Sequence, residues 1–464
     1  IFVHPFPQHS VVLNCIAKPK GEKRSYICDE IGTIKDVSQL NLRRPVDRGY
    51  VVNWDLQKEI WTHVFSKLMK IDPKKCHLII TEPPFNLPAA AAAQDEVIYK
   101  HFQFKSCLTS VPASLVMHER IGALKETANE TSSDDEKNNL NKVITSARCG
   151  VVVDVGFSFA HITPVFDGRI VRSAVRRVNL GGKALTNYLK ELVSYRQWNM
   201  MDEYFLVDDV KEKLCYVAAD EDDFETNLKN AKVKGATNEI TKEYVLPDGV
   251  HVIRGYVKSG PAHDPDSDDD DSDDDPDEGS KKRKKLSKSK NTPTKKTASN
   301  NTSKDSQTLG MGNERFMVPE ALFHPSDVGL KQAGIAEATK QAIESTKKNK
   351  QLFGMFYGNV VLCGGCCRFP GFKERFISEL RPFVEASDLL QVSGVGGGVG
   401  NHGLGNQSET NFDDPVTCAW RGGSRIGASE EFERLALTRD EYVKDQAVTT
   451  NKLEQHAPVV NGRM

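Results

Sequence analysis

The stretch from Cys149 to His161, CGVVVDVGFSFAH, places the strongest constraint on the fold. Its apolar run ends in Asp154-Val155-Gly156, and a second short apolar run follows Ser158. This pattern predicts a strand, a tight turn and a returning strand. A glycine after a buried strand lets backbone N–H groups approach a phosphate, and an adjacent Asp can hold its Mg²⁺ through water. An ordinary hairpin with an Asp in its turn has the same pattern, so this stretch alone leaves both interpretations open.

The bulk properties indicate a soluble intracellular protein. The 464 residues suffice for two or three domains, each with its own core. Acidic and basic residues nearly balance, with a net charge of -2, and therefore point to no class of partner. No apolar run approaches the roughly 18 to 20 residues that span a bilayer, and residues 1–30 lack the apolar core of a secretory signal. The ten Cys fit reduced thiols, and an Ile at position 1 indicates a processed or incomplete chain.

The first part of the chain alternates predicted strands and helices. Trp54, Ile60, Trp61 and Phe65 recur at helical spacing after Asn53 or Asp55, either of which can cap the helix. The run at 76–81 predicts a central strand that delivers the loop Glu82-Pro83-Pro84 to a cleft. The other predicted elements here are strands at 11–16, 24–28 and 102–108, helices at 89–101 and 112–121, and a surface loop or disordered insertion at 125–142.

The second part continues the alternation with one interruption. Asp167-Gly168 joins two β-branched runs, which is a strong hairpin signal. Helices are predicted at 184–195, 335 onward and 373–380, strands at 244–249, 250–257 and 359–362, and a flexible glycine-rich loop at 394–411. A further helix is predicted at 208–220, with Lys211 and Glu212 near its start. The last signals are the run 416–420 and a closing helix that carries Phe432, Leu435 and Leu437.

Residues 258–310 are predicted to be disordered. An acidic run, DPDSDDDDSDDDPDE, precedes the basic run KKRKKLSKSK, and neither can bury enough apolar surface to offset the chain entropy. The acidic run is either a solvated linker or a mimic of nucleic acid that engages histones. The basic run is either a nuclear localisation signal or a solvating, DNA-tethering tail. We expect the flanking strands to pair without this insertion.

Several familiar sites are absent or weakly supported. No G-x-x-x-x-G-K-[ST] loop occurs, which excludes the P-loop class. Cys363 and Cys366 form a C-x-x-C without a second ligand pair of that spacing, so a zinc or redox site is not favoured. No nucleophile and base can be paired from the sequence alone.

Taken together, several segments resemble the actin family. They are residues 43–65, 152–170, 178–189, 208–220, 244–249, 312–325 and 360–372, in the order and spacing of that family. The resemblance implies an α/β, actin-like two-lobed fold of the ribonuclease H-like ATPase superfamily, with four subdomains around a nucleotide cleft. It divides the chain into a small lobe at 1–147, a large lobe at 148–257 and 311–417, the disordered insertion at 258–310, and a C-terminal return to the small lobe at 418–464.

The resemblance also implies a nucleotide site for ATP or ADP with Mg²⁺. The residues that match it are Asp154, Gly156, Ser158, Lys211, Glu212, Gly364, Gly365, Cys366 and Phe369. Asp154 matches the residue that holds the Mg²⁺ through water, Lys211 and Glu212 match adenosine contacts, and His161 matches a polar residue near the attacking water.

Three departures from the family pattern weaken the expectation of catalysis. No strand-loop-strand that would clamp the phosphates from the small lobe is found before Val11. Pro112 takes the place of a Gln that orients the water, and proline offers neither a side-chain donor nor an N–H. Phe157 and Ser158 replace a smaller turn, and Arg368 replaces an apolar neighbour of adenine.

We therefore expect a non-catalytic actin-related scaffold of a nuclear chromatin-remodelling complex that exchanges a Z-type histone variant into nucleosomes. Its expected partners are the ATPase subunit of the remodeller, zinc-containing companion subunits, the histones of the nucleosome and DNA. An ATPase or small-molecule kinase of the same superfamily and a filament-forming cytoskeletal relative are the alternatives.

Overall fold

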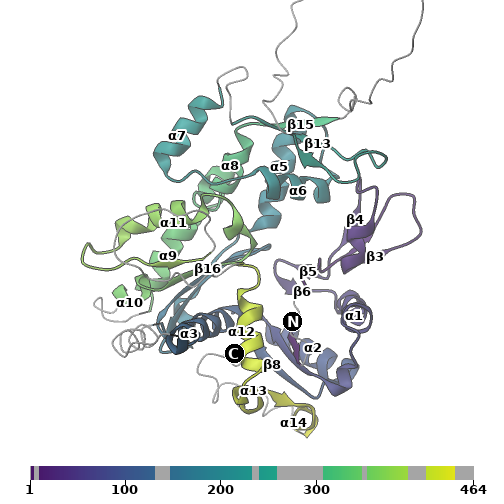
Figure 1. The fold of residues 1–464 in the computed structure, drawn as a ribbon, viewed down its shortest axis with the longest axis vertical. Coiled ribbons are helices and arrows are strands. Elements are labelled where there is room, and N and C mark those ends of the chain that lie inside the picture. Colours follow the sequence, from purple (N-terminus) through teal and green to yellow (C-terminus); the bar gives the residue numbers. More distant parts are fainter. Residues whose placement is uncertain are drawn as a thin grey trace, which may run out of the picture.

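The computed structural model describes residues 2–4, 10–130, 147–232, 240–258, 307–346, 353–394 and 414–444. Its elements form two lobes, each built on a mixed sheet (Figure 1). The expected disordered or flexible segments lie outside the described residues at 131–142, 259–306 and 395–411, but residues 125–130, expected in a surface loop, belong to a helix that runs from Pro112 to Glu130. Among the helices described, none is both long enough and apolar enough to cross a membrane.

The small lobe is built on a four-stranded sheet in the order β1-β7-β8-β18. Its strands are β1 (Phe2–His4), β7 (His77–Thr81), β8 (Ser106–Ser110) and β18 (Leu437–Thr438). Smaller sheets join β2 (Ile16–Lys18), β3 (Tyr26–Ile27) and β4 (Asn41–Arg43), and β5 (Val46–Asp47) and β6 (Tyr50–Val51). The helices are α1 (Trp54–His63), α2 (Pro88–Glu96), α3 (Pro112–Glu130), α12 (Cys418–Gly427), α13 (Glu430–Leu435) and α14 (Arg439–Lys444).

Local sequence explains most of this lobe. The Asn53 side chain accepts a hydrogen bond from the Leu56 N–H at 2.9 Å and caps α1, as predicted. The buried face of α1 places Ile60 and Trp61 in the small-lobe core, and Phe65 joins them from the π-helix Val64–Leu68 that follows. Strand β7 lies between β1 and β8, so the central position predicted for the run 76–81 is confirmed.

The large lobe is built on a sheet in the order β11-β10-β9-β16-β17, with β12 also on β10. Its strands are β9 (Gly150–Val155), β10 (Ala160–Phe166), β11 (Arg169–Ile170), β12 (Arg176–Val178), β16 (Val360–Cys363) and β17 (Val392–Ser393). A second sheet joins β14 (Tyr256–Val257), β13 (Lys242–Val245) and β15 (Thr308–Met311). The helices are α5 (Gly182–Arg196), α6 (Tyr204–Leu214), α7 (Glu221–Asn230), α8 (Glu314–Glu320), α9 (Ile335–Glu344), α10 (Phe353–Tyr357) and α11 (Phe372–Leu380).

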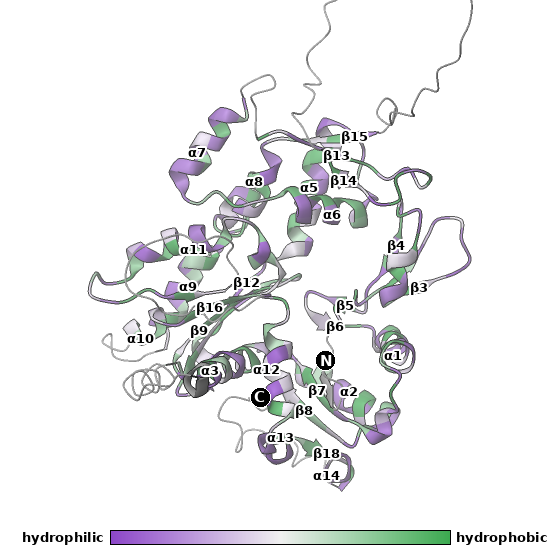
Figure 2. Ribbon diagram, in the orientation of Figure 1, coloured by the Kyte–Doolittle hydropathy of each residue, from purple (hydrophilic) through white to green (hydrophobic). Residues whose placement is uncertain are grey.

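The hydropathy of the elements follows their position in this lobe. The two central strands are apolar, whereas α7 at the outside is largely hydrophilic (Figure 2). Strand β9 runs antiparallel to β10 and parallel to β16, and Val151, Val152 and Val153 are fully buried. The hairpins predicted at 149–161 and at Asp167-Gly168 are both confirmed. Strands β14 and β15, which flank residues 259–306, lie in one sheet but do not pair with each other, because β13 lies between them and pairs with both.

Several sequence predictions of strand bounds are wrong. Residues 11–15 form no strand: Val11 and Leu13 are exposed, and β2 begins at Ile16. The strand expected at 102–108 begins only at Ser106, because Val97–Phe102 continues α2 as a π-helix. The run 250–257 is a strand only at its last two residues, and β15 begins at Thr308, inside the expected insertion.

The helix predicted at 208–220 is displaced. It begins at Tyr204 and ends at Leu214, so Lys211 and Glu212 lie in its last turn and not near its start. Beyond the helix, the Tyr216 N–H donates to the Arg315 carbonyl at 3.0 Å and the Val217 N–H donates to the Pro370 carbonyl at 2.8 Å. Hydrogen bonds to other elements therefore replace those of the helix.

The C-terminal prediction also fails in part. Helix α12 runs through Gly422 and Gly423, and Leu437 lies in β18 and not in the closing helix. A Cβ at Gly422 would overlap the backbone of Leu115 in α3. The glycine therefore permits close packing of α12 on α3, and those two helices also pack on the large-lobe sheet through Val116 and Cys418.

Candidate functional site

The turn after β9 is held in place by the start of α5. The Gly156 N–H donates to the Phe159 carbonyl at 3.1 Å, which closes the turn. The Gly182 and Lys183 N–H groups donate to the carbonyls of Gly156 and Phe157 at 3.1 and 2.8 Å. The positive end of the helix dipole of α5 therefore faces the turn, as in sites that bind anions. Ser158, the other predicted phosphate contact, lies partly buried in the same turn.

The loop after β16 lies directly beside this turn. Gly364 has a φ of +93°, and a Cβ there would overlap the Val155 carbonyl and lie 2.7 Å from the Asp154 Oδ1. Next to it, a Cβ at Gly365 would meet no atom within 4 Å, so the backbone there borders open space. The Cys366 Sγ donates to the Gly156 carbonyl at 3.4 Å. The structure thus brings Asp154, Gly156, Gly364, Gly365 and Cys366 together at the carboxyl ends of two parallel strands, where open α/β sheets bind ligands.

Asp154 also borders a cavity of about 230 Å³ between the two lobes. Large-lobe residues on its wall include Asp154, Phe159 and His161, and small-lobe residues include Glu82 and Pro112. Burial raises the pKa of Asp154 to about 6. At about 30 Å³ for each water, the cavity has room for several waters. A carboxylate that burial makes costly to ionise, beside space for water, fits a hydrated Mg²⁺ that would favour the charged form.

His161 faces the same cavity as a neutral side chain. It is buried, and burial, followed by the charge of Arg177, lowers its pKa to about 3. Its Nε2 atom has no hydrogen-bond partner among the described residues. The loop of Glu82, Pro83 and Pro84 lines this cavity too, as the sequence predicted for the end of β7.

The remaining predicted site residues are placed differently. Lys211 is buried beneath the turn, and its Nζ donates to Asp208 Oδ1 at 2.5 Å and to Thr186 Oγ1 at 2.8 Å. Glu212 is exposed in the same turn of α6. Phe369 is buried in the large-lobe core. Lys211 is therefore held in the interior beneath the turn by these hydrogen bonds, and Phe369 packs with its apolar neighbours.

Sequence reasoning missed a set of residues that joins the two lobes, here called the clasp: Gly49, Tyr50, Phe159 and Arg177. The guanidinium of Arg177 lies 4.2 Å from the centroid of the Phe159 ring and donates to the Tyr50 hydroxyl at 3.0 Å. A Cβ at Gly49 would overlap the Phe159 ring, so only glycine allows this contact. In the sequence, the bulky Phe159 in this turn was the residue that could have indicated a contact with the other lobe.

Two other clusters offer no better site. Glu320, His324 and Glu379 lie close enough to hold a metal ion, but Arg375 already bonds to Glu320 at 2.6 Å and to Glu379 at 2.7 Å. The ten Cys thiols are free and buried, as expected for reduced thiols. Burial raises the pKa of Cys366 to about 12, which disfavours the thiolate that a metal or redox site needs.

Comparison with known proteins agrees with this architecture. A family model described as Actin matches residues 5–451. An actin-related protein 6 from Oryza sativa subsp. indica is 37% identical over 436 residues, covering 93% of this chain and 90% of that protein. The actin-related protein 6 sequences of Arabidopsis thaliana and Drosophila melanogaster are 36% and 32% identical, each covering 93% of this chain and 91% of the relative. With its two-lobed α/β fold and these relatives, the chain belongs to the actin family.

Proposed function

We propose that the chain is a non-catalytic actin-related scaffold subunit of a nuclear chromatin-remodelling complex that exchanges a histone variant into nucleosomes. In this proposal ATP or ADP with Mg²⁺ holds the two lobes together and is not turned over. The family membership and the match to actin-related protein 6 sequences support the actin-related part. The chromatin role rests on the sequence resemblance and on the acidic and basic runs at 264–278 and 281–290.

The position of Pro112 is the observation that carries the non-catalytic part. Pro112 lines the 230 Å³ cavity together with Asp154 and His161, where a water would have to be oriented for attack on a phosphate. Proline supplies neither a side-chain donor nor an N–H at this point. Positioned acid or base groups typically contribute about 10² to 10⁴ in rate, so their absence leaves little hydrolysis.

The chain still offers groups that fit a nucleotide. Asp154 would hold the hydrated cation, and Ser158 and Gly365 would approach the phosphates with backbone N–H groups, while Gly156 and Gly364, whose N–H groups bond to the carbonyls of Phe159 and Pro415, would shape the two turns. Lys211 and Cys366 would support this arrangement from below, and exposed Glu212 would reach the nucleoside. A ligand that binds only the closed form stabilises it by mass action without being hydrolysed.

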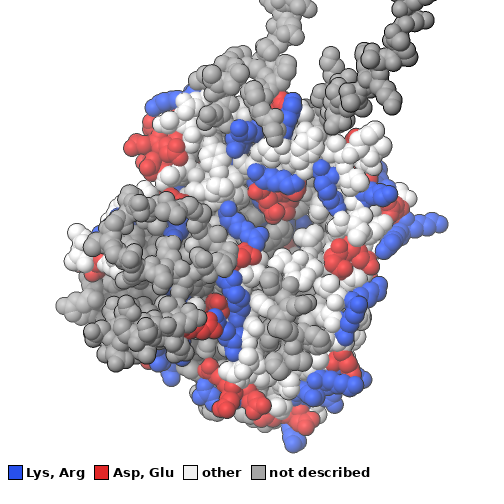
Figure 3. Space-filling view, viewed as in Figure 1, with Lys and Arg blue, Asp and Glu red and all other residues white. Residues whose placement is uncertain are grey.

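The proposed partners are macromolecular. They are the remodeller's ATPase subunit, its zinc-containing companion subunits, the histones of a nucleosome and DNA. Lysine and arginine side chains alternate with acidic ones over the face in Figure 3, so no single-sign patch dominates that described surface. Recognition of basic histones would then depend on the acidic run at 264–278, which lies outside the described residues. We do not expect the protein to form filaments.

Two assays test the proposal. Equilibrium dialysis with ATP and Mg²⁺ should show binding, while phosphate release by the same protein should stay at the level of a buffer control. A remodelling complex reconstituted with and without this chain should then be compared for exchange of the histone variant on nucleosomes, and exchange should fall when the chain is omitted. Phosphate release well above the control would favour the ATPase or kinase alternative, and sedimenting polymer at micromolar concentration would favour the cytoskeletal one. Unchanged histone exchange would overturn the chromatin role.

A further inference from the structure

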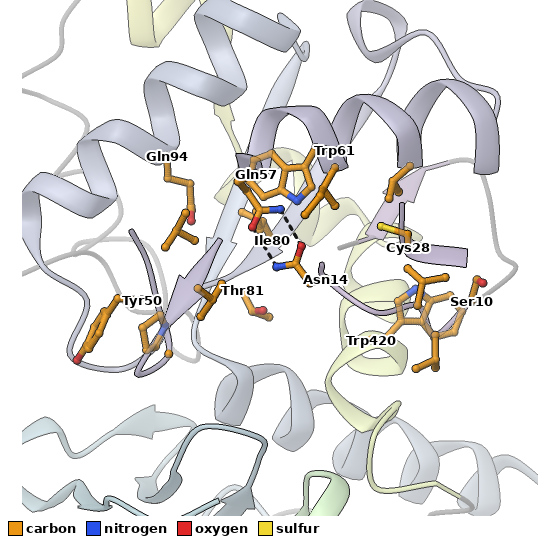
Figure 4. Close-up of a pocket in the computed structure, with 18 of the residues that line it drawn as sticks. Ser10, Asn14, Cys28, Tyr50, Gln57, Trp61, Ile80, Thr81, Gln94 and Trp420 are labelled. Carbon is orange, nitrogen blue, oxygen red and sulfur yellow. Dashed lines mark hydrogen bonds between the residues drawn. The ribbon is translucent and has the colours of Figure 1, made fainter. Parts of the chain in front are cut away.

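The small sheet of β2, β3 and β4 forms a tip of the small lobe with an apolar core of its own. At its base the tip is tied to α1, because the side-chain amides of Asn14 and Gln57 exchange hydrogen bonds of 3.0 and 3.1 Å (Figure 4). The tip is thus fixed to the rest of its lobe, so its contacts with the large lobe depend on whether the two lobes are closed. The buried residues of its core are Cys15, Ala17, Ile31, Ile34, Val37 and Leu40.

An aromatic side chain of the large lobe completes this core. Phe205, near the start of α6, is partly buried and packs against the apolar residues of the tip. If the tip moved away from the large lobe, this ring would lose its apolar neighbours and face water, which is unfavourable. The apolar core of the tip is therefore shared between the two lobes.

Hydrogen bonds between the lobes surround this apolar contact. The Gln39 N–H of the tip donates to both carboxylate oxygens of Glu203, at 3.2 and 3.0 Å. Arg254, in the loop between β13 and β14, donates from Nη2 to the Gly32 carbonyl at 2.5 Å. Gln39 has a φ of +48°, a left-handed conformation that is costly for a residue other than glycine and persists only where surrounding contacts hold it. The conformation of the tip at Gln39 is thus coupled to its docking on Glu203.

The docked tip also places a cation over the phosphate turn. The guanidinium carbon of Arg44, the residue after β4, lies 4.5 Å from the centroid of the Tyr204 ring and 5.4 Å from that of Phe157. Tyr204 begins α6, and Phe157 belongs to the turn after β9 that would hold the phosphates. Two aromatic rings of the large lobe therefore hold a small-lobe side chain beside this turn, by attraction between the cation and the ring faces.

None of these contacts between described residues involves a ligand. Glu203, Tyr204 and Phe205 are consecutive, and they engage the backbone, a cation and the apolar core of the tip. Because one helix start makes all three contacts, we expect them to form and break together as one cooperative unit. A ligand that approaches the turn past Arg44 has to wait until this unit opens.

We propose that these contacts form a latch, which keeps the two lobes closed without a ligand and must open for a nucleotide to enter or leave. The gating part rests on the proposed nucleotide site, whereas closure of the lobes does not. The latch contacts are the same with and without ligand, so loosening them should speed association and release alike and leave the dissociation constant nearly unchanged. The latch consists of Gly32, Gln39, Arg44, Glu203, Tyr204, Phe205 and Arg254.

A matched pair of phenylalanines provides the main variants. Phe205→Ala loosens the latch, and Phe224→Ala is the control, because Phe224 of α7 is also partly buried but packs on Phe316 inside the large lobe, with ring centroids 5.4 Å apart. Alanine favours a helix at both positions, so both variants should fold. Arg254→Ala removes a latch contact made by a different element and leaves α6 untouched.

Spin labels measure closure without nucleotide. All ten native thiols are buried, so labels react selectively with Lys23→Cys in the tip and Glu191→Cys in α5, both at exposed positions. Double electron–electron resonance on the ligand-free full chain should give one narrow distance distribution, which extends to longer distances in Phe205→Ala and Arg254→Ala but not in Phe224→Ala. The proposal is overturned by a broad distribution in the parent that narrows only with ATP and Mg²⁺, by unchanged distances in both loosened variants, or by an equal response of Phe224→Ala.

Exchange of a fluorescent nucleotide measures gating. The probe is the methylanthraniloyl derivative of ATP with Mg²⁺, with association followed by stopped flow and release followed after addition of excess ATP. Both rates should rise about tenfold in Phe205→Ala and less in Arg254→Ala, while the dissociation constant changes by less than about threefold and Phe224→Ala matches the parent.

Two results of the exchange experiment would count against gating. Faster release with unchanged association, and hence weaker binding, would show that Phe205 contributes to affinity and does not control access. If neither the parent nor any variant binds the probe, the nucleotide site fails and gating fails with it, while the spin-label distances decide separately whether the latch closes the lobes.

Discussion

The two walls of the inter-lobe cavity are built in different ways. On the large-lobe side the lining residues are Asp154, Phe159, His161 and Thr163, and the glycine-rich turns at the ends of β9 and β16 lie next to Asp154. On the small-lobe side the lining includes Pro83 and Pro84 after β7 and Pro112 at the start of α3, together with Thr81 and Glu82. A carboxyl group and an imidazole on the large-lobe side thus face a small-lobe side that contains three prolines, which have no N–H.

This difference separates holding a nucleotide from hydrolysing it. Binding of phosphates requires close backbone approach and a cation ligand, which the large-lobe wall retains. Hydrolysis requires in addition a polar group that orients water, and Pro112 cannot provide one. The clasp of Arg177, Phe159, Tyr50 and Gly49 joins the walls by contacts that do not involve a ligand. The predictions below test each of these parts.

The largest effect is expected for Gly364→Ala, which alters the loop after β16 in the large lobe. The positive φ and the overlap with the Val155 carbonyl should together cost about 3 kcal/mol of unfolding free energy or more. Gly365→Ala is the matched control, because its Cβ would enter open space. It should change the free energy of unfolding by less than about 1 kcal/mol while weakening nucleotide binding. Urea denaturation measures the free energy of unfolding, and equilibrium dialysis measures nucleotide binding. Equal losses of stability in the two variants would show that the close approach of Gly364 to Val155 does not set the stability of this loop.

The next effect concerns the charge of Asp154. Its pKa of about 6 in the folded protein lies above the ordinary value of 3.8, so the folded state binds more protons between those values. The free energy of unfolding should therefore fall as the pH rises from about 4 to about 6, and this cost stays in full above pH 6. Without nucleotide at pH 7, Asp154→Asn should stabilise the protein by about 1 to 3 kcal/mol, and below pH 4 the two proteins should be alike.

Addition of ATP with Mg²⁺ tests the proposed role of Asp154 as a ligand of the cation. The ligand should raise the melting temperature of the parent protein but have little effect on Asp154→Asn, because the cation loses its carboxylate. An equal response of both proteins would remove Asp154 from the cation site.

A smaller effect is expected at the clasp. Arg177→Ala removes the contact with the Phe159 ring and the hydrogen bond to Tyr50, which together should lower the free energy of unfolding by about 1 to 2 kcal/mol. Small-angle scattering without nucleotide should show a larger radius of gyration, and saturating ATP should reverse part of that change. Arg169→Ala, at an exposed arginine in β11, is the control. If both variants behave alike, the clasp does not hold the lobes.

The sequence predicted the parts of this arrangement that depend on local pattern. The β9–β10 hairpin follows from a valine run, Asp154 and Gly156, and the loop after β16 follows from an apolar strand that ends in a glycine pair. Helix α1 follows from its apolar spacing and the Asn53 cap. The parallel pairing of β9 with β16, which brings these loops together, joins residues more than 200 positions apart, and no local pattern predicts it.

What the sequence could not predict depends on contacts between distant elements. The end of α6 at Leu214 is set by hydrogen bonds to Arg315 and Pro370, and α12 continues through its glycines because they pack on Leu115. The burial of Lys211 follows from its pairing with Asp208 and Thr186, which a helix pattern does not reveal. Likewise, the contact of Phe159 with Gly49 requires the two lobes to be in place.

The smallest expected effect comes from adding a polar group to the small-lobe wall. Pro112→Gln places an amide at the cavity beside Asp154 and His161, at the first position of α3, where proline is favourable but not required. An amide can orient water but cannot take its proton, and His161, with a pKa lowered to about 3, is neutral near pH 7 and weakly basic. Phosphate release should therefore rise by roughly tenfold at most, well below the 10² to 10⁴ of a fully positioned acid or base. Pro112→Ala, which removes the ring without adding an amide, should leave phosphate release unchanged. A hundredfold rise in Pro112→Gln would show that the small-lobe wall lacks only this one group, and that the protein lies one substitution away from an active ATPase.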